Sequence, residues 1–191
     1  MKIFLKTIKL ITLSVFIVLT QYSCDYILEK KNSRNEISHS AQTRINIYKR
    51  EAKLFLKASK NNLDILELCD MLKIIDTQNS VSHLTNTLEK THFEILQNYD
   101  ALAQNKLISI PRYIKKENRI ENIRSLNNEA FIESNLKLIL NKTENQIQLL
   151  DDLGNVTDNV DFKVLVIKDT HTLKSNIDKI EMTLSSLNQV N

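Results

Sequence analysis

The sequence predicts an all-α protein, a bundle of about five mostly antiparallel helices behind a lipidated N-terminal tether. The chain has one glycine and one proline in 191 residues. Tight turns, hairpins and phosphate-binding loops use glycine for its positive φ, so sandwiches, barrels and nucleotide-binding α/β folds are disfavoured. Several segments instead repeat apolar residues at alternating spacings of three and four, which places them on one helix face. Long helices joined by a few polar connections satisfy both observations.

The first 23 residues have the pattern of an export signal. The first nine contain lysines and no acid, and residues 10–20 contain only apolar residues, threonine and serine. A basic start, a short apolar core and a small residue before the cut are typical of a secretory signal. Because this signal ends at Cys24, we predict a signal peptide over 1–23 and lipid attachment to the Cys24 thiol. An uncleaved membrane anchor is the alternative, but a spanning helix needs about 20 apolar residues.

The signal departs from the usual lipoprotein pattern at one position. An aliphatic residue normally stands three places before the cysteine, whereas this chain has Gln21 there. We interpret the motif as relaxed. Residues 24–35 are polar and lack a sustained period, which predicts a flexible tether that reaches at most about 40 Å. Residues 36–191 are then the helical domain.

Charge and cysteine content set limits on the exported chain. Loss of the leader removes three of the 26 basic residues and leaves 23, equal to the number of acidic residues. A net charge near zero gives no reason to expect nucleic acid as a partner. Once Cys24 carries lipid, Cys69 has no disulfide partner, and its apolar neighbours predict a small buried side chain.

The first helical stretch begins near Ile37 and continues to about residue 75. Its apolar stripe is followed by a denser apolar run from Leu63, while basic residues occupy the other side. Asn61 and Asn62 are a plausible break, with Asn62 capping the second segment. One long kinked helix is the alternative, because no glycine or proline interrupts the stretch. The stripe consists of Ala41, Ile45, Tyr48, Ala52, Phe55 and Ser59.

A polar run at 76–80 predicts the next loop, with Ser80 or Ser82 capping a helix that extends to about Asn105. The segment that ends in Pro111 stops this helix, since proline pushes the residue before it out of the α region. Residues 112–124 are basic, with a weak apolar face that is enough for a short helix. The connection around 105–118 is the longest, so we expect it to carry exposed, interacting residues.

Two longer helices complete the domain. Asn128 begins the first, and Gly154 stands just beyond its expected end, where a left-handed cap favours glycine. Thr157 or Asp158 begins the last helix. Residues 162–167 are rich in β-branched residues, yet no second strand is available to pair with them, so we assign them to this helix. Its packing seam is Val166, Thr170, Leu173, Ile177, Ile180, Leu184 and Leu187.

No constellation for catalysis, metal or cofactor is present, so we predict a protein that is not an enzyme. The histidines lack metal-binding spacing. We expect His92 and His171 at a helix surface or boundary, and nothing places His83 beside Cys69. Of the acids around Gly154, Asp158 and Asp161 are better explained by the dipole of the last helix than by an ion site, whereas Asp151 and Asp152 gain nothing from that dipole. The histidines are His39, His83, His92 and His171, and the acids are Asp151, Asp152, Asp158 and Asp161.

Two basic surfaces, near residues 44–60 and 112–124, are the candidates for binding a partner. Either one could also be a solvated helix face balanced by acids elsewhere. If a ligand binds, we expect Arg112, Lys115, Lys116 and Arg119 to contact it, because charges at the rim of an interface steer association.

The opening MKIFLKTIKLITLSVFIVLTQYSCD, with its relaxed positions before Cys24, resembles that of Borrelia surface lipoproteins. The composition, rich in Lys, Asn, Ile and Leu and poor in Gly and Pro, is similar as well. In size the chain is similar to the factor H-binding lipoprotein of relapsing-fever species and to the helical complement-regulator-acquiring proteins. These families offer no short binding motif to match. The resemblance implies a tethered helical module that captures a host protein such as complement factor H or plasminogen.

Three functional hypotheses follow. The first is an outer-membrane lipoprotein that faces the cell exterior, binds a host plasma protein and contributes to immune evasion. The second is a periplasm-facing lipoprotein with a structural, assembly or immunity role. The third is self-association, because a seam alone does not say whether its partner helix belongs to the same chain or to a second copy in a homodimer.

Overall fold

The computed structural model describes residues 40–74, 79–114 and 128–189. The predicted signal peptide, the lipidation site Cys24 and the tether therefore lie outside the described residues. The contacts divide the chain into two units, residues 1–46 and residues 47–191. Residues 40–46 are helical.

The described residues contain four helices and no β-strand, so the all-α prediction is confirmed with four helices where about five were expected. Most of the short helix expected within 112–124 lies outside the described residues. The four helices are the N-terminal helix (40–73), α2 (Asn79–Lys106), α3 (Asn128–Val156) and α4 (Val160–Gln189). None of these helices combines the length and apolar character that crossing a membrane requires. The start of α2 lies just before the predicted capping serines.

The N-terminal helix runs through Asn61 and Asn62, so the predicted break is wrong and the single long helix is correct. The Asn62 amide donates to the His92 backbone carbonyl over 2.9 Å, and its oxygen contacts the His92 ring. The Asn61 amide donates to the Asn145 side chain over 2.7 Å. Neighbouring helices thus satisfy amides that could otherwise have capped a new helix.

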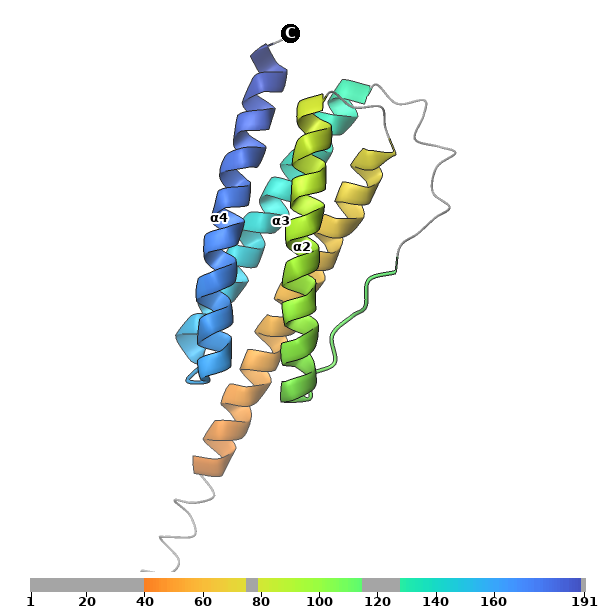
Figure 1. Cartoon of the computed structure of the whole chain (residues 1–191). Helices are drawn as coiled ribbons and strands as arrows, with labels where there is room; N and C mark the ends of the chain where they lie inside the picture. Colours follow the sequence, from red (N-terminus) through yellow and green to blue (C-terminus); the bar gives the residue numbers. More distant parts are fainter. Residues whose placement is uncertain (1–39, 75–78, 115–127, 190–191) are drawn as a thin grey trace, which may run out of the picture. The chain divides into compact units, whose positions relative to one another are not determined.

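Contacts between the helices define the topology, which can be followed in Figure 1. Tyr48 contacts Lys106 and Asn62 contacts His92, so the N-terminal helix and α2 are antiparallel. The Asp64–Lys142 ion pair and the Asn61–Asn145 hydrogen bond make it antiparallel to α3 as well. Helices α2 and α3 are therefore parallel, so they are joined by a crossover connection and not by a short turn. One long crossover of this kind is a feature of ferritin-like four-helix bundles.

Aromatic and aliphatic side chains fill the interior between the helices. Phe55 makes edge-to-face contacts with Tyr99 and Phe162, with ring centroids 5.2 and 5.4 Å apart. The predicted seam of α4 packs inside this chain, since its residues Val166, Leu173, Ile180 and Leu184 are buried. The β-branched run at 162–167 is helical, as expected.

Gly154 has a different role from the one predicted. Helix α3 continues past it to Val156, and Gly154 does not have a positive φ. A Cβ atom at this position would lie 3.3 Å from Cγ1 of Val166. The glycine therefore allows close packing of α3 against α4 and does not form a left-handed cap.

The start of α4 is held by a chain of polar contacts. Asn159 caps the helix, because its Oδ1 accepts hydrogen bonds from the amides of Asp161 at 3.0 Å and Phe162 at 3.4 Å. The Thr157 hydroxyl accepts from the Asn159 amide at 3.0 Å and donates to the buried carboxylate of Glu51. The predicted start at Thr157 or Asp158 is therefore slightly early, and Thr157 instead joins the turn to the N-terminal helix.

Helix α2 ends in a left-handed residue that is not glycine. Leu107 has φ of 54°. The Ile108 amide donates to the Ala103 carbonyl at 2.9 Å, and the Leu107 amide donates to the Gln104 carbonyl at 3.3 Å. This pair of bonds is the Schellman motif, in which glycine is preferred at the position that Leu107 occupies. The Leu107 side chain is 91% exposed, so packing does not offset the backbone cost.

We expect Leu107→Gly to raise the free energy of unfolding by up to about 1 kcal/mol. A left-handed conformation costs an ordinary L-residue about 1–2 kcal/mol, and the greater entropy of unfolded glycine cancels part of that gain. Urea unfolding measures the difference. Leu107→Ala is the matched control, because it removes the side chain and keeps the strained φ. A gain in the alanine variant equal to that in the glycine variant would contradict the backbone explanation.

Candidate functional site

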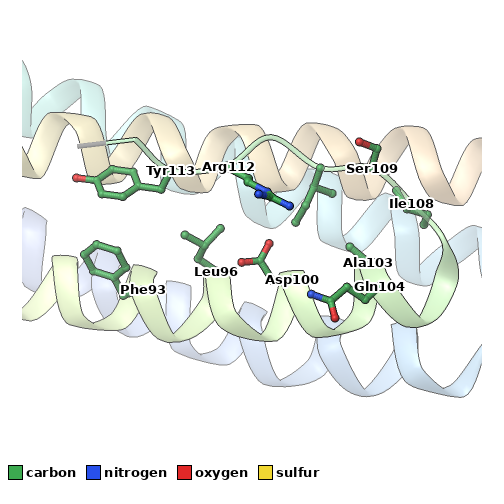
Figure 2. A pocket seen from close by; sticks show the side chains of 10 residues that line it. Phe93, Leu96, Asp100, Ala103, Gln104, Ile108, Ser109, Arg112 and Tyr113 are labelled. Carbon is green, nitrogen blue, oxygen red and sulfur yellow. The ribbon is translucent and has the colours of Figure 1, made fainter. Parts of the chain in front are cut away.

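A groove lies between α2 and the extended segment 107–114 that follows it, with a cavity volume of about 560 Å³. Figure 2 shows the side chains of the segment and of α2 lining the groove from opposite sides. This volume is in the range of sites that bind small molecules or single anchoring side chains. The lining residues are Phe93, Leu96, Asp100, Ala103, Gln104, Ile108, Ser109, Ile110, Arg112 and Tyr113.

The extended segment is fixed at both ends. Ile108 and Ile110 pack against the core at one end. At the other end the Tyr113 ring contacts Phe93 edge-to-face, with centroids 5.2 Å apart, and the Tyr113 hydroxyl donates to the Asp70 carboxylate. Burial and this bond to Asp70 raise the pKa of Tyr113, so it stays protonated as the donor. The groove therefore has one wall made of a helix and one made of a tied segment.

Opposite charges face each other across the groove. Asp100 projects from α2 and Arg112 from the extended segment, each toward the other wall (Figure 2). No ion pair joins these two side chains among the interactions of the described residues. Leu96 and Ala103 add apolar surface, while Gln104 adds an amide. The groove can therefore bind an apolar side chain together with both an acidic and a basic group.

Of the four residues predicted to contact a ligand, only Arg112 belongs to the described part. It is exposed and lines the groove. Lys115, Lys116 and Arg119 lie outside the described residues, so nothing in the structure brings the four together. Asp100 was not predicted, since it lies on a helix with nothing in the local sequence to mark it. The one available signal was the length of the connection around 105–118.

The structure corrects the prediction for His92, which is fully buried and not at a surface or boundary. Its Nδ1 lies 2.7 Å from Oδ1 of Asn62, so Nδ1 carries the hydrogen and donates it. Burial lowers the pKa of His92 to about 3. Nε2 is buried without a partner among the described residues. His171 is exposed, as predicted.

A spacing typical of metal-binding bundles is present in α2 but does not form a site. Glu89 and His92 are separated as in the Glu-x-x-His motif of carboxylate-bridged metal bundles. The Glu89 carboxylate, however, forms an ion pair with Lys73, while the His92 ring bonds to Asn62. Within the described ranges, no three potential ligands of His, Cys, Asp or Glu type converge.

A cluster of three polar residues, separate from the Asn62–His92 pair, lies in the core where α2, α3 and α4 meet. The Gln146 amide donates to the Tyr99 hydroxyl over 3.1 Å, and that hydroxyl hydrogen-bonds to Asp169. All three residues are buried. Burial raises the pKa of Asp169 to about 6, although the nearby Lys168 and the Tyr99 hydrogen bond oppose the rise. Oδ2 of Asp169 has no hydrogen-bond partner in the described part of the chain.

Cys69 is a buried free thiol, as predicted. Burial is the main cause that raises its pKa to about 12, and the carboxylates of Glu89 and Asp70 add to the effect. A thiol in this setting stays protonated at physiological pH, so it packs as a small apolar side chain.

Comparison with known proteins gives a likeness in fold. No family model matches the sequence, and no curated protein matches it. The crystal structure of a DUF305 fragment from Deinococcus radiodurans is similar to this chain, with a TM-score of 0.61 and 13% sequence identity. The match covers 72% of this chain and 96% of that one. At this identity the likeness concerns the helical bundle alone.

Proposed function

We propose that the protein is a surface-exposed bacterial lipoprotein that binds a host protein through the groove beside Arg112, with complement factor H as the first ligand to test. The export signal and Cys24 support the location, and the resemblance to Borrelia lipoproteins supports the class of ligand. The observation that carries the proposed site is the position of Arg112 on a tied segment beside an open groove.

The physical case for this site is preorganisation. Because Tyr113 and the two isoleucines hold the segment, binding does not have to order a flexible loop, and that saving increases affinity. Arginine and tyrosine are also enriched among the residues that dominate binding energy in protein interfaces. Ile114, next to Tyr113, is 73% exposed and adds apolar surface beside Arg112.

We expect Arg112→Glu to weaken binding of purified factor H by at least about tenfold, the loss typical of a residue worth 1.4 kcal/mol or more. Surface plasmon resonance on the full-length protein measures the affinity, with plasminogen tested in parallel. Lys57→Glu makes the same change in charge on the exposed face of the N-terminal helix, the other basic surface. Loss of binding in the Lys57 variant alone would move the site to that surface.

Protease treatment of intact cells tests the location. Cleavage of the protein supports exposure on the cell surface. Protection in intact cells, with cleavage after lysis, would instead support the periplasm-facing hypothesis and remove host proteins as ligands.

A further inference from the structure

We propose that the end of the bundle formed by Tyr48, Leu107 and Val160 is a membrane-docking surface that rests on the lipid bilayer to which the chain is anchored. This inference rests on the proposed membrane anchoring but does not depend on the host ligand. It concerns a different part of the molecule from the groove.

Three exposed apolar side chains from three helical segments gather at this end. The Tyr48 hydroxyl donates to the Lys106 carbonyl over 2.6 Å, and Lys106 directly precedes Leu107. The Lys106 ammonium forms an ion pair with Asp161 at 2.7 Å, and Asp161 directly follows Val160. These contacts place the three side chains around one point, Lys106.

The exposure of these side chains is unusual for their type. Leu107 is 91% exposed, Val160 71% and Tyr48 44%. Leu107 also occupies a left-handed position at which glycine would cost less. A strained residue that packs against nothing in its own unit is better explained by a contact outside it. On α4 the apolar surface continues from Val160 over successive turns to Val164 and Ile167, which are also exposed.

The position of this end in the chain identifies the bilayer as the occupant. The unit begins at Ile47, next to Tyr48, so the segment that carries Cys24 joins the unit here along the chain. A lipid on Cys24 would hold this end within reach of the membrane. Exposed aromatic and aliphatic side chains bordered by basic residues are typical of protein surfaces that bind at the membrane interface.

The charges at this end fit an anionic bilayer. Lys49, Arg50 and Lys53 are exposed on the N-terminal helix, while Glu51 between them is buried. Lys163 on α4 is half exposed and has only a loose contact, 3.6 Å, with Asp158. Juxtamembrane basic residues each add about 1 kcal/mol of attraction to an anionic surface.

The absence of tryptophan from the chain makes a direct test available. Leu107→Trp and Val160→Trp each introduce one fluorophore into the proposed surface. Met182→Trp is the matched control, because Met182 is also exposed and lies about 33 Å farther along α4, at 1.5 Å per residue. The full-length variants are reconstituted with vesicles of phosphatidylcholine and phosphatidylglycerol that contain brominated lipid, which quenches tryptophan within the bilayer.

We expect fluorescence quenching at least twofold stronger for Leu107→Trp and Val160→Trp than for Met182→Trp, with emission shifted to the blue. Flotation of the vesicles separately reports anchoring, so a failure to float would contradict the anchoring proposal. Floating protein with equal quenching in all three variants would overturn the docking surface. A shift of the Leu107→Trp emission caused by host protein, and not by lipid, would overturn it as well, because a protein would then be the occupant.

Discussion

Asp169→Asn is expected to stabilise the bundle by about 2 kcal/mol at pH 7.5. At this pH the buried Asp169 is ionised with one oxygen unpartnered, and the rise of its pKa from 3.8 to about 6 measures the cost. Two pKa units correspond to about 3 kcal/mol. The buried amide that replaces the carboxylate offsets part of this gain, since its nitrogen also lacks a partner.

The sign of the pH dependence follows from the raised pKa. Protonated Asp169 is favoured in the folded state, so its favourable contribution is complete below pH 3.8 and is lost as the pH rises through 6. The advantage of Asp169→Asn should therefore be full above about pH 7 and should vanish near pH 4. Urea unfolding over this range measures it. An advantage independent of pH would show that ionisation of Asp169 is not its cause.

His92 is expected to produce a larger pH effect than Asp169, with the opposite sign. Its pKa falls from 6.5 to about 3 on folding because the fully buried ring excludes the proton. The stability it contributes is complete above pH 6.5 and is lost as the pH falls through 3, by about 5 kcal/mol in all. His92→Asn keeps a donor for Asn62 and removes this titration, so the difference between the unfolding free energies at pH 7 and pH 4 should be smaller in the variant by about 3 kcal/mol.

The two groups should oppose each other between pH 6 and pH 4. In this range the folded state binds the proton of Asp169 and the unfolded state binds the proton of His92, so their contributions to the slope cancel. Asp169→Asn alone should then lose stability as the pH falls, and His92→Asn alone should gain it. The double variant, in which neither group titrates, completes the double-mutant cycle. If the free energy of unfolding changed with pH by the same slope in both single variants, the attribution of these two titrations to Asp169 and His92 would be refuted.

Periodicity predicted the helices well where their own sequence determines them. Helix α3 begins at Asn128 as expected, and the β-branched run at 162–167 is helical, with no strand beside it in the described part of the chain. The prediction failed where a neighbouring helix decides the outcome. Asn61 and Asn62 favour a break locally, yet partners on α2 and α3 bond to both amides and the helix continues.

The buried polar residues were open to prediction in principle. His92 stands on the apolar stripe of α2, four residues after Leu88 and three before Ile95, and that register marks an inward-facing position. Asp169 precedes the seam residue Thr170 on α4 and lies three residues after Val166 and four before Leu173, which also marks an inward-facing position. The residue type, and not the spacing, suggested a surface for His92.

The groove could be predicted only in part. The long connection after α2 pointed to the segment that carries Arg112, and Pro111 explains why that segment is extended. The opposite wall could not be predicted, because Asp100 faces Arg112 only after the segment turns back along α2 at Leu107. That reversal depends on a left-handed leucine, for which the sequence gives no signal.

The chain of contacts from Glu51 through Thr157 to Asn159 has a mechanical consequence. If the protein is anchored through Cys24 and binds a ligand as proposed, a pull from that ligand would enter the bundle through the N-terminal helix. Load along the axis of that helix would shear many side-chain contacts at once and would not peel them apart one by one. Since Glu51 bonds to Thr157 in the turn before α4, part of such a force would pass to α4.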